Sequence, residues 1–259
     1  MNKDTIQAYG ELSSLFYDAT EHYASEQEVK FFSSCIEQYP GRVLEAMSGS
    51  GRLQIPLMQL GYVVDGVDIS YAMLARCRQR CATLELKPEL YEQSLENLAL
   101  PHKYSIAIIA FGSLQLITDR DLVLKSLKNI NAHMLPGGNL LIETFEPDIT
   151  LDEFSVSTVR LDERKIIRLK KRHVFDLEKK MADSFCLYEL LVDGLVCQQE
   201  DELIEVVWRS DDEWRELLLE AGFEVTRIHD EPLRKSELYR VIHARSILPS
   251  QTAENMKLK

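Results

Sequence analysis

The segment from Val43 to Leu53, V-L-E-A-M-S-G-S-G-R-L, constrains the fold of this chain more than any other. An apolar pair runs into Glu45, a short glycine-containing turn follows, and a new apolar segment continues to Leu60. Glycine lets the backbone turn sharply and approach a ligand closely, because it has no Cβ. The free N–H groups of a helix start then face whatever binds there. The pattern predicts a strand, a tight loop and a helix whose N-terminus faces a ligand.

The composition excludes several classes of partner. The chain has 259 residues and a net charge of −12, so no general attraction to nucleic acid or to an anionic membrane is expected. No apolar run approaches the roughly 18 residues of a membrane helix, and residues 1–4 show no signal-peptide pattern. The five cysteines have no metal-site spacing, which favours a cytoplasmic protein with reduced thiols and no metal.

Strand and helix patterns alternate over the first 150 residues, after a helical stretch at about 4–38 in which Ser25-Glu26-Gln27-Glu28 fits a capping box. Apolar runs predict strands at 42–46, 62–68, 89–93, 105–110 and 139–145. Helical periodicity lies between them, at 52–60, 71–84 and 119–134. This alternation predicts an α/β protein with a parallel, doubly wound sheet.

At about residue 156 the helical periodicity of the apolar residues disappears. Alternating segments at 157–160, 166–175, 183–191 and 203–208 predict an antiparallel β insertion, with Asp193-Gly194 as a hairpin turn. The α/β core then resumes with a helix that Ser210 caps and Gly222 ends. Two last strands are expected at 223–228 and 239–244.

The second strand of the core ends at Asp68, 17 residues after Gly51. A carboxylate at this edge of a doubly wound sheet can accept hydrogen bonds from both hydroxyls of a ribose. The same geometry serves NAD, but G-x-G-x-x-G is incomplete, since no third glycine follows Gly49-Ser50-Gly51. An NAD-dependent oxidoreductase therefore stays as the weaker alternative, and an ordinary turn residue is the other interpretation of Asp68.

Together these segments resemble the class I S-adenosylmethionine-dependent methyltransferases, over about residues 9 to 246. E-x-M-x-G-x-G from Glu45 is similar to the family's E/D-x-G-x-G-x-G, and I-S-Y-A-M-L from Ile69 is similar to its I-S-x-x-M-L. L-P-G-G-N-L from Leu135 and A-G-F from Ala221 match two later motifs. The resemblance implies a Rossmann-like, seven-stranded sheet with an antiparallel last strand, and S-adenosylmethionine as the cofactor.

The resemblance also implies which residues contact the cofactor. Glu45 orients the glycine loop, the loop glycines admit the amino-acid end of the cofactor, and Asp68 binds its ribose. Ile69 and Met73 flank the adenine, and Ser94 and Leu95 meet its edge. Phe111 lies near the reacting methyl group. The full implied set is Glu45, Met47, Gly49, Gly51, Asp68, Ile69, Met73, Ser94, Leu95 and Phe111.

Three positions depart from the family pattern. Met47 stands where the first motif glycine is usual, Ser94 replaces an acidic residue that holds the adenine amino group, and Ser105 replaces an aspartate. These departures motivate one alternative, a nonenzymatic or regulatory binding protein on a degenerate methyltransferase fold.

For the acceptor side, the resemblance points to the loop after the fourth core strand. Gly112, Ser113 and Gln115 are the substrate-binding candidates there, with Tyr17 of an N-terminal lid. Methyl transfer is an in-line displacement from a reactive sulfonium, so positioning and water exclusion can supply much of the catalysis. No catalytic residue is assigned; the candidates are Tyr17, His173 and Gln115.

The resemblance divides the chain into four parts. These are a helical lid at 1–38, a cofactor-binding core at 39–150 and 209–247, the β insertion at 151–208, and a flexible tail at 248–259. The insertion resembles that of sugar N-methyltransferases and glycine N-methyltransferase-like enzymes, so we expect a small-molecule acceptor, with the insertion as substrate lid or homodimer contact. A methyltransferase acting on RNA is disfavoured by the acidic charge.

The basic residues 164, 168, 170 and 172 share one strand face. A solvated face is preferred there over a phosphate site.

Overall fold

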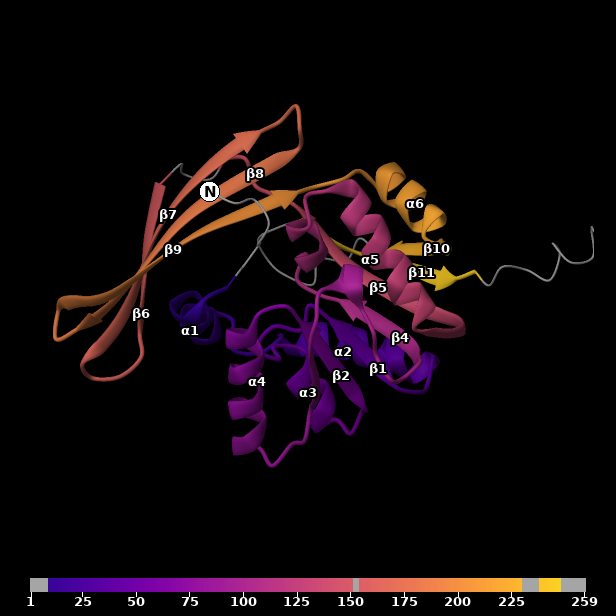
Figure 1. The fold of residues 1–259 in the computed structure, drawn as a ribbon, viewed down its shortest axis with the longest axis horizontal. Coiled ribbons are helices and arrows are strands. Elements are labelled where there is room, and N and C mark those ends of the chain that lie inside the picture. Colours follow the sequence, from indigo (N-terminus) through magenta and orange to yellow (C-terminus); the bar gives the residue numbers. More distant parts are fainter. Residues whose placement is uncertain (1–8, 151–153, 230–237, 248–259) are drawn as a thin grey trace, which may run out of the picture.

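The computed structural model describes residues 9–150, 154–229 and 238–247. The predicted flexible tail at 248–259 lies outside these residues. Two sheets make up the described fold, one of seven strands and one of four. Figure 1 shows the seven-stranded sheet at the centre of the helices and the four-stranded sheet extending to one side.

The seven-stranded sheet has the order β10-β11-β5-β4-β1-β2-β3. β1 to β5 are parallel to one another, and β11 is antiparallel to both β5 and β10. The prediction of a doubly wound sheet with an antiparallel last strand is confirmed. The strand bounds are β1 Val43–Ala46, β2 Val64–Asp68, β3 Glu89–Glu92, β4 Tyr104–Ile109, β5 Met134–Glu146, β10 Phe223–His229 and β11 Leu238–Ser246.

Helices cover both faces of this sheet, because its central strands are apolar on both sides. Leu44 and Ala46 face α5 and α6, whereas Val43 faces the opposite cluster, to which α2 and α3 contribute. Burial of these side chains is the main stabilising term. The helices are α2 Glu26–Gln38, α3 Gln54–Gln59, α4 Tyr71–Thr83, α5 Arg120–Ala132 and α6 Asp211–Glu220, with short 3-10 helices η1 Leu95–Asn97 and η2 Ser113–Leu116.

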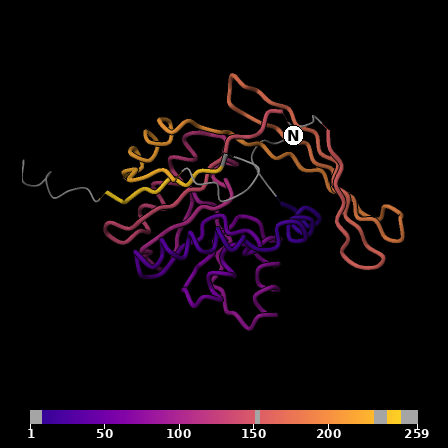
Figure 2. Tube along the Cα trace, turned by 180° about the vertical axis from the view of Figure 1, so that it is seen from behind, coloured from indigo at the N-terminus to yellow at the C-terminus, as the bar shows by residue number. Residues whose placement is uncertain are grey.

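The predicted insertion is an antiparallel sheet of four strands in the order β6-β7-β8-β9. Asp193 and Gly194 both have positive φ, 50° and 83°, as a two-residue hairpin turn of this kind requires. Helix α1, Glu11–Thr20, lies between this sheet and α4, and Leu12 packs on the inner face of the sheet. Figure 2 shows from behind how far the sheet extends beyond the core. Its strands are β6 Phe154–Arg160, β7 Lys165–Asp176, β8 Met181–Val192 and β9 Leu195–Val207.

The structure differs most from the sequence-based bounds in three places. The helical stretch is interrupted at residues 21–25, although α2 starts, as predicted, at the Ser25–Glu28 capping box. β5 starts at Met134 rather than 139, because a register shift against β4 accommodates Pro136-Gly137-Gly138. β9 starts at Leu195 rather than 203, since pairing with β8 extends through its polar residues. In the described part of the chain, no helix is long and apolar enough to cross a membrane.

Candidate active site

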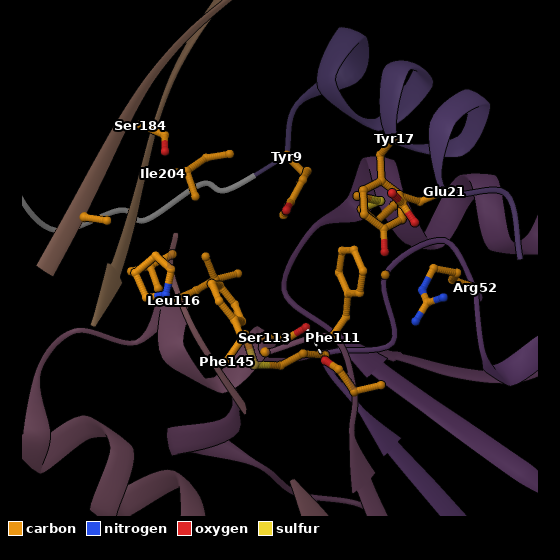
Figure 3. Close-up of a pocket in the computed structure, with 18 of the residues that line it drawn as sticks. Tyr9, Tyr17, Glu21, Arg52, Phe111, Ser113, Leu116, Phe145, Ser184 and Ile204 are labelled. Atoms are coloured by element: carbon orange, nitrogen blue, oxygen red, sulfur yellow. Dashed lines mark hydrogen bonds between the residues drawn. The ribbon is translucent and has the colours of Figure 1, made fainter. Parts of the chain in front are cut away.

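A cavity of about 440 Å³ lies where the carboxyl ends of the core strands face α1 and the inner face of the four-stranded sheet. Figure 3 shows Tyr17 on α1 and Glu21 directly after it, Arg52 and Phe111 in the core, and Ser184 and Ile204 on the strands opposite. Most of the predicted site residues meet in this cavity. Those that line it are Tyr17, Glu45, Met47, Gly49, Asp68, Ile69, Met73, Phe111, Gly112, Ser113 and His173.

The loop after β1 is fixed to the end of β2 by Asp68. The N–H of Gly49 donates to Asp68 Oδ2 at 2.8 Å, and the N–H of Ser70 donates to Oδ1 at 2.8 Å. Burial raises the pKa of this carboxyl, and the backbone N–H donors oppose that rise. Each carboxylate oxygen can accept further hydrogen bonds on the cavity side. The arrangement thus suits a ligand with two adjacent hydroxyls.

Three loop residues have left-handed backbone conformations, Met47 at φ 59°, Gly49 at 55° and Gly51 at 83°. A Cβ on Gly51 would lie 2.7 Å from Cys77 Sγ, so this glycine lets the loop pack on α4 and does not line the cavity. A Cβ on Gly49 would meet only Met73 Sδ, at 3.8 Å. Met47 lines the cavity in a conformation that non-glycine residues rarely adopt, which explains why glycine suits this position.

Glu45 is 3% exposed, and its Oε2 has no hydrogen-bond partner among the described residues. Burial raises its pKa to about 8, with Arg52 lowering it and Asp68 raising it. A carboxyl in this state gains from a positively charged ligand in the cavity, because such a ligand favours the ionised form.

A buried ion pair supports the cavity wall next to Phe111. Arg52 donates to both carboxylate oxygens of Glu28, at 3.2 and 2.5 Å, and its guanidinium lies 4.6 Å from the centre of the Phe111 ring. Phe111 has a φ of 60°, and its N–H donates to Glu143 Oε2 at 2.6 Å. The edge of Tyr17 meets the same ring at a centroid distance of 6.0 Å. The aromatic side chain is therefore held between the core and α1.

Helix α1 is tied to the glycine loop by Arg80 of α4. Arg80 donates to Ser50 O at 3.0 Å, to the backbone oxygen of His22, and to Asp18 Oδ1 at 3.3 Å. Asp18 also pairs with Arg76 of α4.

The N-terminus of α1 is capped by the insertion. Gly10, at the N-cap position, provides no side-chain cap. Instead Glu200 of β9 accepts the N–H groups of Leu12 and Ser13, both at 2.9 Å, and Glu202 accepts those of Tyr9 and Gly10. Sequence reasoning missed this contact, because the pattern around Glu200 resembles a solvated acidic segment and the partners lie almost 190 residues away.

The insertion supplies the far wall of the cavity. His173 and Ser184 lie opposite each other on β7 and β8, with His173 Nδ1 2.9 Å from Ser184 Oγ. The His173 ring stacks with Phe175 at a centroid distance of 6.0 Å. Burial, with Lys171 nearby, lowers the pKa of His173. The imidazole is therefore favoured in its neutral form.

Besides Gly51, three predicted contact residues do not line the cavity. Gln115 is 1% exposed, and its amide bonds to Phe145 N at 2.8 Å and Phe145 O at 2.9 Å, which ties η2 to the end of β5. Ser94 accepts a hydrogen bond from Asn97, and Leu95 is packed in the core cluster of α5 and α6. Motif position alone cannot show that these side chains are already engaged. The described residues also contain no group of three or more metal-ligating side chains.

Comparison with known proteins bears on the chemistry of this cavity. Residues 43–138 match the family described as methyltransferase domain. A relative in Bacillus subtilis (strain 168), YqeM, carries the name of a methyltransferase without a stated substrate. It is 21% identical over 220 residues, which are 85% of this chain and 88% of that protein.

Two solved structures share the fold. The sugar N-methyltransferase KedS8 from Streptoalloteichus sp ATCC 53650 has a TM-score of 0.74 at 16% identity, covering 93% of this chain and 98% of that one. SAM-bound CalS10, an amino pentose methyltransferase from Micromonospora echinaspora, has a TM-score of 0.68 at 16% identity, covering 92% and 98%. The comparisons support the predicted resemblance: residues 43–138 match a methyltransferase domain, and the chain has the fold of solved S-adenosylmethionine-dependent methyltransferases.

Proposed function

We propose that this chain transfers a methyl group from S-adenosylmethionine to a small-molecule acceptor within the cavity described above. One observation carries the proposal. A single cavity joins the glycine loop and Asp68 at the core edge to His173 and Ser184 on the insertion sheet. Ligands of open α/β sheets bind at the carboxyl ends of the strands. The core side thus receives the cofactor, and the insertion side receives the acceptor.

On the cofactor side, Asp68 accepts hydrogen bonds from the two ribose hydroxyls. Ile69 and Met73 flank the adenine, and Gly49 leaves room for the amino-acid end. Glu45 sits next to this end, where its ionised form is favoured by the positive charge of the cofactor. The cofactor supplies an activated methyl group on a sulfonium sulfur.

On the acceptor side, the chain mainly positions the nucleophile and excludes water. Phe111 and Tyr17 lie at the boundary between the two halves, and Gly112 follows Phe111 in the lining, so the reacting atoms would meet there. When the acceptor must lose a proton, His173 is the base. With Nδ1–H donating to Ser184 Oγ, Nε2 remains free of a proton and accepts it. Gln115 acts as a positioning residue through its bonds to Phe145.

Each part of the chain has its own proposed role. Within the described residues, the lid is assigned to 9–38, the cofactor core to 39–150, 209–229 and 238–247, and the substrate wall to 154–208. The KedS8 and CalS10 likenesses support a small acceptor of this kind. A homodimer contact on the insertion stays a prediction, which sedimentation analysis of the purified protein would test.

A crystal structure with S-adenosylhomocysteine tests this assignment. The ribose hydroxyls are expected within hydrogen-bond distance of Asp68, with the sulfur directed toward Phe111 and Gly112. A ligand bound elsewhere, or a site blocked by the Met47 side chain, would support the regulatory binding protein instead.

A further inference from the structure

We infer that the acceptor carries an anionic group, a carboxylate or a phosphate, that Lys171 binds on the insertion wall of the cavity. The inference deepens the proposed function and rests on it, because it assigns the insertion side of the cavity to the acceptor.

Lys171 belongs to a row of side chains on the inner face of the four-stranded sheet. β7 contributes Lys171, His173 and Phe175 to the cavity lining, at alternate positions that share one face. Register places Lys171 opposite Cys186 and His173 opposite Ser184 on β8. The ammonium-bearing residue is therefore two positions before His173 on β7, on the same face of the sheet as the proposed base and its partner Ser184.

The neighbouring cations of β7 on the outer face are already paired. Arg168 and Lys170 both bind Glu189, at 2.6 and 3.1 Å, and they hold the pKa of Glu189 down to about 2. Among the residues that the structure describes, Lys171 forms neither an ion pair nor a hydrogen bond through its ammonium. Glu189 thus neutralises Arg168 and Lys170 on the outer face, which agrees with the preference for a solvated face there over a phosphate site. Lys171 faces the cavity without such a partner.

Two acidic side chains on this side of the cavity accept hydrogen bonds from other groups, although Glu202 Oε2 has no partner among the described residues. Glu202 lies in the same row, but Cys186 stands between them. Two strand spacings separate Lys171 and Glu202 by roughly 10 Å, and Glu202 accepts N–H groups of the lid segment. Asp148 of the cavity rim accepts hydrogen bonds from Thr150 N and Oγ1, at 2.9 and 2.6 Å. Neither carboxylate neutralises the Lys171 charge within contact distance.

Arg52 also lines the core half, but Glu28 pairs with it, so the remaining charge is divided along the cavity. Glu45 and Asp68 line the core half, where a cationic sulfonium cofactor is favoured. Lys171 lines the insertion half, together with the hydrogen-bonding groups of His173 and Ser184. An acceptor with its nucleophile toward Phe111 and an anionic group toward Lys171 matches both halves. A partly enclosed ammonium binds such a group by a charge-assisted hydrogen bond.

The test uses inorganic phosphate and acetate as probes, with binding followed by the ³¹P and ¹³C resonances of the ions at low chloride. Lys171→Met is compared with Lys170→Met, which removes the same charge from the outer face one residue away. We expect the wild-type protein to bind at least one probe, Lys171→Met to bind it about tenfold more weakly, and Lys170→Met to bind it as the wild type does. Lys171→Arg should retain binding, because it keeps the charge.

Each result either supports or overturns the anion site at Lys171. Phosphate binding that depends on Lys171 indicates a phosphorylated acceptor, and acetate binding indicates a carboxylate. Equal binding by the wild type and Lys171→Met, an equal loss in Lys170→Met, or no binding by the wild type would overturn the inference. S-adenosylhomocysteine titration of the same four proteins separates the two claims. Its failure in the wild type removes the methyltransferase proposal, whereas Lys171-dependent anion binding would still stand as an anion site.

Discussion

Replacing Glu200 should loosen α1 and open the cavity, although Glu200 does not line it. Its two oxygens accept the Leu12 and Ser13 N–H groups at 2.9 Å and serve as the cap that Gly10 lacks. Loss of an N-cap costs about 1 kcal/mol, and loss of a carboxylate at a helix N-terminus costs up to about 1 kcal/mol more. We therefore expect Glu200→Ala to favour local opening of α1 by about 2 kcal/mol, roughly 30-fold. Glu200→Gln, which keeps one acceptor, should lose about half of that energy.

Amide hydrogen exchange across α1 measures this opening directly, because exchange rates report local unfolding. Asp201→Ala is the matched control, since Asp201 is the exposed next residue on β9 and has no hydrogen bond to α1 in the described structure. Gly10→Ala provides a second test, because a Cβ there would lie 2.7 Å from the Glu200 carboxylate. The reasoning fails if exchange in α1 is the same in Glu200→Ala and Asp201→Ala.

Three further predictions address the site itself. Asp68→Ala should weaken S-adenosylhomocysteine binding at least about tenfold by calorimetry, since two charge-assisted hydrogen bonds are lost; unchanged affinity in a folded variant removes Asp68 from the site. Burial raises the pKa of Glu45 from 4.5 to about 8, so the folded state binds more protons than the unfolded one in this window, and stability should fall as the pH rises through it. Glu45→Gln should flatten that dependence in urea unfolding, and an equally steep profile would contradict the assignment. His173→Asn should lower the methyl-transfer rate about 10²- to 10⁴-fold with S-adenosylhomocysteine affinity unchanged; an unaltered rate and pH profile exclude His173 as the base.

Local patterns predicted the core well, because its determinants are local. The apolar run of β4 is buried at every position, and the glycine loop after β1 has the backbone conformations that glycine permits. The Ser25–Glu28 and Ser210–Glu213 capping boxes both form. Each of these features depends on residues close together in the chain.

Contacts between distant segments account for what the sequence did not reveal. Glu200 caps α1 only because the insertion folds back over the lid. Gln115 lies at the predicted edge of the sheet, but its side-chain amide is hydrogen-bonded to the backbone of Phe145 and is not available to a substrate. Lys171 and Lys170 are adjacent in a run of basic residues, and only strand orientation decides which one faces the cavity. Side-chain direction and competition between partners are properties of the assembled sheets.

Calorimetric titration with S-adenosylmethionine and S-adenosylhomocysteine, with NAD as the control, tests the proposed function most directly. Binding of both adenosyl ligands at about micromolar dissociation constants, with none of NAD, is the predicted result. Absence of adenosyl binding by a folded protein would contradict it, and would favour the binding-protein alternative, with Met47 closing the site to the cofactor.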